Sequence, residues 1–576
     1  MRIVVARRVS QAFFAAVFLW FCAAASLGGR FWQLSGWPVN WLIELDPLAA
    51  FGTLVYTRGF YAPLFWAVAS LALTAFLGRF FCGFVCPLGA LNQATGWLAR
   101  IGRPHGARVA DNRLRPAQAV KFYVLGFFLA CGLFGPLLSG LLDPIPLLHR
   151  SVNLTLAPVL DSGLQVLSAK PRSYASAWLI LAVLAAILGL NLVLPRFFCR
   201  FVCPLGALFG LVNRFTPWRI GKVRGACGDC HLCETHCEGA CRPSGHFVAG
   251  ECVLCLNCLD RCPHGLIGFG TRPSVAGESA LPEPSRRAVV LALAAGALAA
   301  PVFRVGALAG FNRNPQLIRP PGALDEARFL ARCLRCGQCM RVCPTNVLQP
   351  ALLEAGIEGI WTPVLNNRIG HSGCQLTFIA CGHVCPTAAI RPLTLDEKLG
   401  RGEFAAKGPL RLGTAFVDRS RCLPWVMDRP CLVCQELCPV SPKAIFTRTV
   451  FEAVRGGRAE VSRAEDPACA LSGLAPIPVK LVSGDYFLRP AGRPEAAPRR
   501  ILAVEAANFR LAPARDWTLS AGQAVEIVVQ LQRPFVDAAR CIGCGVCEHE
   551  CPILGLRGIR VSFENESRSG PGRMLL

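Results

Sequence analysis

Long apolar runs dominate the first third of the chain. Four of them, at residues 11–29, 60–78, 122–142 and 177–195, contain few polar positions. About 20 apolar residues in a helix cross the hydrocarbon layer of a membrane, so each run predicts a transmembrane helix. A fifth run, 288–303, is rich in alanine and shorter. It predicts either a fifth span or a buried helix of a soluble domain.

Basic residues are concentrated in the connections that follow the second and fourth runs. Residues 79–121 carry seven Lys and Arg against one acidic residue, Asp111, and residues 196–224 carry six basic residues and no acidic one. Short connections rich in Lys and Arg stay in the cytoplasm. We therefore expect these connections and the N-terminus inside, and a fifth span would place residues 225–270 and 330–576 on opposite faces.

The four spans form a tandem repeat. RFFCGFVCPLGAL at 79–91 recurs as RFFCRFVCPLGAL at 196–208, and ELDPL at 44–48 corresponds to LLDPI at 141–145. Each half crosses twice, so the halves run parallel about an axis along the membrane normal. The motif cysteines should then meet at the cytoplasmic edge: Cys82, Cys86, Cys199 and Cys203. They could hold a shared metal or iron–sulfur site, act as a redox dithiol, or be structural.

An aspartate precedes a proline in both halves, as Asp46-Pro47 and Asp143-Pro144. Asp at the N-cap with Pro at the first helical position begins a helix, which is the favoured interpretation. The alternative is that these carboxylates accept protons released by quinol. His149, beside Arg150, is interpreted as an interfacial residue rather than a quinol ligand.

Composition supports a membrane protein rich in potential metal ligands. Of 576 residues, 53% are hydrophobic and 17% charged, and the mean hydropathy is +0.43. The formal charge of +24 comes from basic residues that flank apolar runs, so no nucleic-acid partner is expected. The 31 cysteines could form disulfides, zinc sites or iron–sulfur clusters, and spacing decides among these.

The cysteine pattern C-x2-C-x2-C-x3-C is typical of bacterial ferredoxins, in which the fourth thiolate binds the neighbouring [4Fe-4S] cluster. It occurs at Cys227, Cys230, Cys233 and Cys237; Cys252, Cys255, Cys258 and Cys262; Cys333, Cys336, Cys339 and Cys343; and Cys541, Cys544, Cys547 and Cys551. Structural zinc instead favours paired CxxC knuckles. In the first pair of runs we expect Cys262 to join the first cluster and Cys237 the second, with Cys241 as an alternative fourth ligand.

Two further runs depart from this pattern and bring the expected cluster sites to about six. Cys422, Cys431, Cys434 and Cys438 have an enlarged first gap. Cys374, Cys381 and Cys385 provide three thiols, and Phe378 stands where a fourth belongs. An iron without a protein ligand is readily lost, so this site predicts a [3Fe-4S] cluster. Rescue by His371, His383 or Cys469, or an empty site, are the alternatives.

The predicted fold class is an α-helical transmembrane domain, a four-span tandem repeat plus a fifth span, with α+β ferredoxin-like iron–sulfur domains. The expected domains are a membrane domain (1–224), a cytoplasmic two-cluster ferredoxin (225–270), a linker with a fifth span or a twin-arginine-like signal (271–305), and a periplasmic polyferredoxin with four cluster motifs (306–576). Alternating AVEIVVQL at 524–531 predicts strands within 500–535.

Specific motifs resemble a known family. RPPGAL from Arg319, CLPW at 422–425 and PCLVCQELCPVSPKAI at 430–445 resemble NapG/MauM ferredoxin-type proteins, and residues 1–270 are similar to NapH/MauN membrane proteins. The chain thus resembles a fusion of the two. The resemblance also implies that the four later runs pair first with fourth and second with third, which makes Cys438 the remote ligand for Cys374 and Cys381.

The function implied by this resemblance is electron transfer from the quinol pool to a periplasmic oxidoreductase or small carrier. We expect a multi-pass protein of the bacterial inner membrane, in contact with lipid, with cluster domains on both faces. The alternative is a maturation factor that supplies electrons for cofactor installation in a periplasmic enzyme. No Ser-His-Asp set, Walker loop or Rossmann fingerprint stands out, so substrate conversion is expected on another protein.

Overall fold

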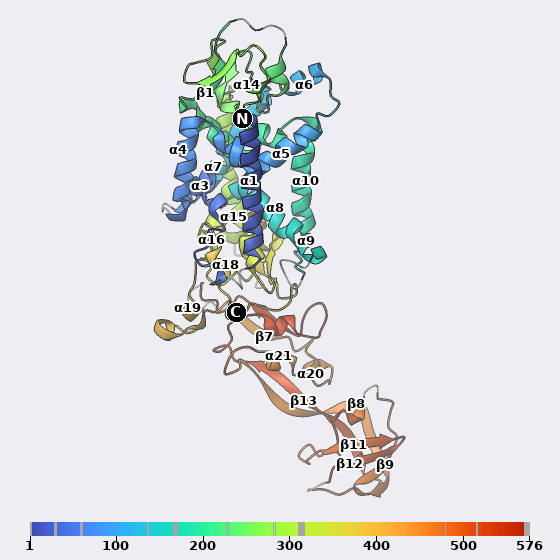
Figure 1. The fold of residues 1–576 in the computed structure, drawn as a ribbon. Helices are drawn as coiled ribbons and strands as arrows, with labels where there is room; N and C mark the ends of the chain where they lie inside the picture. Colours follow the sequence, from blue (N-terminus) through green and yellow to red (C-terminus); the bar gives the residue numbers. More distant parts are fainter. Residues whose placement is uncertain are drawn as a thin grey trace. The chain divides into compact units, whose positions relative to one another are not determined.

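The computed structural model describes residues 3–27, 32–57, 62–134, 137–164, 171–225, 227, 230–279, 281–282, 284–308, 317–477, 480–513 and 516–568. The chain divides into two units, residues 1–370 with 377–410 and residues 371–376 with 411–576 (Figure 1). The boundary after residue 410 therefore divides the segment 306–576, which the sequence alone suggests is one domain.

The first unit is built around a bundle of helices. Its longer members are α1 (Ile3–Ala25), α3 (Pro47–Thr57), α4 (Trp66–Leu77), α5 (Pro87–Leu98), α7 (Val120–Phe134), α8 (Pro144–Ser151), α10 (Ala177–Val193), α12 (Pro204–Val212) and α15 (Arg286–Leu308). Each apolar run predicted to be a span overlaps one of them. Among the described residues, the helices long and apolar enough to cross a membrane are Ile3–Ala25 and His105–Leu133, and Pro63–Leu77 and Ala177–Val193 are shorter apolar helices.

Helix α15, which contains the fifth apolar run, packs along α7. A Cβ atom on Gly296 would overlap the carbonyl oxygen of Phe127, so glycine allows the two backbones to approach closely. The carbonyl of Gly296 also lies 3.3 Å from the Cys131 thiol, and the Ser285 amide donates to the Tyr123 hydroxyl at 2.9 Å. At 1.5 Å per residue this 23-residue helix is about 34 Å long.

Helix α1 connects two cysteine-rich regions. Near its start, Arg7 lies 3.6 Å from Glu238 and donates to Asn257 at 3.3 Å. Near its end, Cys22 is within electrostatic reach of Cys336, and α17 (Gln338–Val342) packs against α1. Figure 1 shows β1 and α14 at one end of the bundle and α16 and α18 at the other. The two regions thus lie at opposite ends of a 23-residue helix.

Strand pairs enclose the cysteine runs two at a time. β1 (Arg219–Lys222) pairs with β3 (Ile267–Gly270), an isolated bridge joins Ala323 to Ile390, and β7 (Thr414–Val417) pairs with β14 (Ile559–Ser562), all antiparallel. Each pair joins the segment before one run to the segment after the next. We call the resulting segments the 219–270, 323–390 and 414–562 modules.

A closed β-barrel is inserted between the two runs of the 414–562 module. Its strands follow the order β10, β11, β12, β9, β8, β13: β8 (Ile445–Glu465), β9 (Ala468–Ser472), β10 (Tyr486–Pro490), β11 (Arg499–Glu505), β12 (Asn508–Leu511) and β13 (Ala524–Val536). Alternate residues of β13 fill its core, among them Val525, Ile527 and Val529. Strands are therefore confirmed within 500–535, in a barrel that begins earlier, at Ile445.

Candidate iron-sulfur centres

The CxxxCP cysteines of the two halves come together, as the repeat predicts. Cys82, Cys86, Cys199 and Cys203, here called the tetrad, interact electrostatically with one another. Cys86 and Cys203 are N-caps of α5 and α12, and their sulfurs accept from the amides of Gly89 at 3.4 Å and Gly206 at 3.2 Å. The proline after each cysteine begins the helix, so the motif places a thiol at a helix N-terminus in both halves.

Polar and basic groups surround the tetrad. The Asn92 amide donates to the Cys199 sulfur at 3.5 Å, and the Arg79 guanidinium lies 3.9 Å from the Cys82 sulfur. The arginine that begins each motif reaches the other half: Arg196 donates to the Cys82 carbonyl at 3.3 Å, and a Cβ on Gly206 would lie 2.9 Å from Arg79 Nη2. These guanidinium groups can offset the charge of thiolates or of a cluster.

Thiols of the two runs of the 219–270 module lie near one another. Burial raises the pKa of Cys233 to about 12, with added contributions from Glu234 and from the thiols of Cys227, Cys237 and Cys262. Burial likewise raises the pKa of Cys258, and Cys255, Cys252 and Cys237 add to it. Cys237 thus lies near thiols of both runs, and Cys262 lies near Cys233 of the other run.

Cys241 lies directly beside Cys237 in the 219–270 module. The two sulfurs are 3.4 Å apart, and the Cys241 amide donates to the Cys237 sulfur at 3.4 Å. The Cys252 thiol also lies close to the Cys241 thiol. The hydrogen bond from Cys241 lowers the pKa of Cys237 to about 7, so Cys237 is the better thiolate. Cys241 remains a neighbouring alternative.

The 323–390 module encloses an apolar cavity bounded by four thiols: Cys333, Cys336, Cys339 and Cys385. Phe329, Val384 and Ile390 also line it, and the Ile390 amide donates to the Cys385 sulfur at 3.4 Å. Thiols around an apolar cavity, with an amide that donates to a sulfur, fit a [4Fe-4S] cluster. Cys385 therefore lies with the preceding run, as crossing requires.

The cysteines of the 414–562 module lie in two separate sets of four. Cys541, Cys544, Cys547 and Cys438 line an apolar cavity, and the Ala415 amide donates to the Cys541 sulfur at 3.3 Å. Burial raises the pKa of Cys422 to about 12, with contributions from Cys434, Cys431 and Cys551. Cys422 therefore lies close to the other cysteines of this set, although the first gap of its run is enlarged.

The position of Cys438 shows that the predicted pairing of the later runs is wrong. Cys438 was expected as the remote ligand for Cys374 and Cys381, but it lies with Cys541 and its neighbours. The physical reason is the antiparallel pairing of β7 with β14, which joins the start of the third run to the end of the fourth. Runs consecutive in sequence therefore share a module.

The run containing Phe378 is divided between the two units. The Cys374 amide donates to the Cys544 carbonyl at 2.7 Å in the second unit. In the first unit, the Cys381 sulfur lies 3.9 Å from the Pro321 carbonyl, and the Phe378 carbonyl accepts from Lys398 at 2.7 Å. A three-iron cluster at this run stays a prediction.

Asp46 and Asp143 begin helices, as predicted. Oδ1 of Asp46 accepts from the Leu48 amide at 2.9 Å, and Oδ1 of Asp143 accepts from the Ile145 amide at 3.3 Å. Sequence reasoning missed that the two buried carboxyl groups lie close enough to interact with each other.

Each of two modules touches the bundle through a glycine. A Cβ on Gly83 would overlap the carbonyl oxygen of Val253, and a Cβ on Gly140 would overlap that of Leu334. Val253 and Leu334 each follow the first cysteine of a run. The residue that follows the first cysteine of a ferredoxin run therefore contacts a glycine of the bundle in both modules.

Buried ion pairs add to the contact between the 219–270 module and the bundle. Arg196 Nε lies 2.7 Å from Glu238, and Lys121 Nζ lies 2.6 Å from Glu251. Arg79 donates to the Gly250 carbonyl at 2.9 Å. Breaking one partner of such a buried pair leaves an uncompensated charge. The arginines of both motif copies thus connect the tetrad to the ferredoxin module.

Comparisons with known proteins agree with iron–sulfur chemistry. A family model described as a 4Fe-4S binding domain matches residues 60–104 and 176–222, which contain the tetrad, and a second model of the same description matches 329–349. The chain is 31% identical over 184 residues to the methylamine utilization ferredoxin-type protein MauM of Methylophilus methylotrophus, covering 31% of this chain and 75% of MauM.

Two other relatives differ in how much of their length is matched. The ferredoxin-type protein NapG of Escherichia coli K12 is 33% identical over 175 residues, which are 29% of this chain and 68% of NapG. The protein NirI of Paracoccus denitrificans is 30% identical over 200 residues, or 34% of this chain but 26% of NirI. The chain thus spans about a quarter of NirI. No solved structure matches the chain significantly.

Proposed function

Because this chain belongs to the family of ferredoxin-type proteins that includes MauM and NapG, we propose that it is a membrane-bound iron–sulfur protein that passes electrons from quinol to a periplasmic oxidoreductase or small carrier. The observation that carries this proposal is the placement of thiol groups along α1. The 219–270 module lies at one end, the 323–390 module at the other, and the tetrad within the bundle.

Six sets of four thiols would each hold one cluster under this proposal: Cys227, Cys230, Cys233 and Cys262; Cys252, Cys255, Cys258 and Cys237; Cys333, Cys336, Cys339 and Cys385; Cys422, Cys431, Cys434 and Cys551; Cys541, Cys544, Cys547 and Cys438; and the tetrad. When bound, a [4Fe-4S] cluster takes up or releases one electron at a potential set by hydrogen bonds, charge and exposure. The chain supplies amide donors to Cys86, Cys203, Cys385 and Cys541.

Quinol oxidation tests the direction of flow. Membranes that contain the protein should show cluster reduction, followed as loss of visible absorbance, on the timescale of turnover after a quinol analogue is added. Clusters that stay oxidised would contradict the proposal. If a strain without the protein keeps normal electron flow once it receives pre-matured partner enzyme, the protein acts in maturation instead.

The membrane arrangement follows from the basic connections and from the ends of α1. We expect residues 225–270 in the cytoplasm and residues from about 330 onward in the periplasm, with α15 as the crossing segment between them. Reporter fusions after residues 270 and 330 should report different compartments. The same compartment for both would show that α15 does not cross.

Phe378 leads to a prediction about iron content. Phe378 stands where the run that contains Cys374 and Cys381 would supply a further thiol. We expect an oxidised three-iron EPR signal that disappears in Phe378→Cys, with about one iron gained per chain. A full four-iron cluster in the unmodified protein would mean that another residue supplies the fourth ligand.

A further inference from the structure

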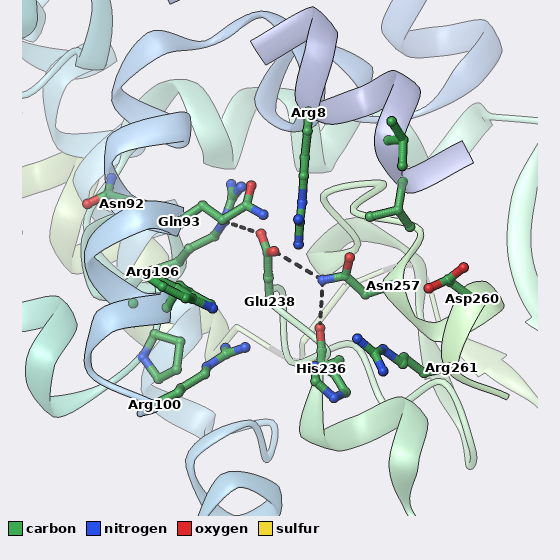
Figure 2. Close-up of a pocket in the computed structure, with 15 residues that line it drawn as sticks. Arg8, Asn92, Gln93, Arg100, Arg196, His236, Glu238, Asn257, Asp260 and Arg261 are labelled. Carbon is green, nitrogen blue, oxygen red and sulfur yellow. Dashed lines mark hydrogen bonds and ion pairs between the residues drawn. The ribbon is translucent and has the colours of Figure 1, made fainter. Parts of the chain in front are cut away.

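A basic cavity lies where the bundle meets the 219–270 module. It has a volume of about 220 Å³. Figure 2 shows its lining side chains converging from the start of α1, from α5, from the segment before α11 (Phe197–Phe201), and from the loop and helix α14 (Asn257–Arg261) of the module. The cavity therefore lies beside both the tetrad and the ferredoxin thiols.

Cationic groups outnumber anionic ones in this cavity. Arg8, Arg100, Arg196 and Arg261 line it, against Glu238 and Asp260. Glu238 already lies 2.7 Å from Arg196 and 3.6 Å from Arg7, a further arginine behind the lining. The side chains that line the cavity therefore carry a net positive charge.

The guanidinium of Arg196 is a buried hydrogen-bond donor in the lining of the cavity. Its side chain is 1% exposed, and its Nη2 has no hydrogen-bond partner among the residues that the structure describes. A buried guanidinium nitrogen without an acceptor is costly, and a ligand oxygen would remove that cost. Guanidinium groups bind phosphate oxygens through paired N–H donors, which makes several converging arginines well suited to a phosphate.

The rim of the cavity is apolar on the side of α1 and α5. Val4, Val5 and Trp97 belong to the lining, and Val5 is 45% and Trp97 62% exposed. α1 starts at Ile3 and its apolar run begins at residue 11, so this rim would lie at the interface between the membrane and the cytoplasm, where tryptophan is enriched. A ligand with a phosphate head and an apolar tail matches this division.

We propose that this cavity binds the phosphodiester group of an anionic phospholipid, with its acyl chains leaving past Trp97 and Val5. Basic pockets between membrane helices on the cytoplasmic side bind such head groups. A neutral quinol would accept hydrogen bonds but would not offset the arginine charge. The inference goes beyond electron transfer and rests on the proposed membrane location of α1.

The position of the bound phosphate gives it a structural role. Asn92, which donates to the Cys199 sulfur, lines the cavity on the bundle side. On the module side, Glu238 follows Cys237 and Asn257 precedes Cys258. One phosphate would therefore hold the module and the bundle together through arginines from both, beside two thiol groups.

Lipid retention by the cluster-loaded, full-length protein tests this proposal. The protein is placed in nanodiscs of phosphatidylcholine with or without phosphatidylglycerol, and bound lipid is counted by native mass spectrometry. We expect retained phosphatidylglycerol, and about twenty-five-fold weaker retention when Arg100 and Arg261 are both changed to Gln, since each guanidinium beside an anionic lipid contributes about a factor of five. Arg272→Gln, an exposed arginine outside the cavity, is the matched control.

Other outcomes separate the alternatives. Arg100→Lys with Arg261→Lys keeps the charge, so retention between that of the unmodified protein and the Gln variant is expected, and visible absorbance confirms that the clusters are intact. Equal retention by all variants would overturn the proposal. Binding of inorganic phosphate without lipid preference would assign the cavity to a soluble anion. Displacement by a quinone analogue regardless of lipid charge would assign it to quinone. Release of the protein from membranes without detergent would instead contradict the membrane location itself.

Discussion

Cys438→Ser is expected to remove the cluster held by Cys541, Cys544 and Cys547, although Cys438 is about a hundred residues away in sequence. The thiol lines the same cavity as these three, and a cubane without its fourth thiolate loses iron readily. The loss should be up to about four iron atoms per chain, with the EPR signal of one cluster. Iron analysis and low-temperature EPR of the purified protein measure both.

Two further variants make this result specific. Cys551→Ser should affect the other group, Cys422, Cys431 and Cys434, because crossing is reciprocal. Cys469→Ser should change neither, since Cys469 is buried in the barrel core, away from these thiols. If Cys438→Ser instead removes the cluster of Cys422, Cys431 and Cys434, crossing within this module is refuted.

The sequence predicted much of this arrangement because ferredoxin spacing is local. Three thiols with two-residue gaps fit one loop, so the runs at Cys227, Cys333 and Cys541 were identifiable without a structure. The crossed partners that we expect in the 219–270 module come from the same rule. The enlarged gap before Cys431 did not hide its run, because the closing spacing was intact.

The predicted pairing of the later runs was wrong because it came from the family resemblance and not from the local sequence. The information was present in short strand-forming segments, TAFV at 414–417 and IRVS at 559–562, whose pairing closes one module. RIGK at 219–222 closes the first module with IGFG at 267–270 in the same way. Four-residue strands separated by a barrel are weak signals in sequence, so a structure was needed to match them.

Contacts between modules and bundle could not be predicted at all. The two motif copies differ at one position over thirteen residues, Gly83 in the first and Arg200 in the second. The difference is visible in the sequence, but its meaning depends on Val253, which is far away along the chain. In the structure Arg200 donates to the carbonyls of Asp111 and Arg113, whereas Gly83 contacts the ferredoxin run.

Gly83→Ala is expected to destabilise the contact between the 219–270 module and the bundle. The added methyl would overlap the Val253 carbonyl, which is backbone and is held between two cysteines of a run. Overpacking of this kind costs about 1–3 kcal/mol, and a shifted backbone would also move the thiols of Cys252 and Cys255. Thermal loss of visible absorbance should occur at lower temperature, and magnetic coupling between neighbouring clusters should weaken in EPR.

Gly189→Ala is the matched control because it also adds one methyl to a glycine in the bundle. A Cβ on Gly189 meets no atom within 4 Å, and the residue lies inside α10. Alanine is favoured over glycine in a helix by up to about 1 kcal/mol, so this variant should be neutral or more stable. Gly83→Arg, which makes the two motif copies identical, should abolish the contact, because the guanidinium would have to enter the space of Val253. Unchanged melting and coupling in both Gly83 variants would show that this peptide does not rest on the bundle and that the module is held by its ion pairs alone.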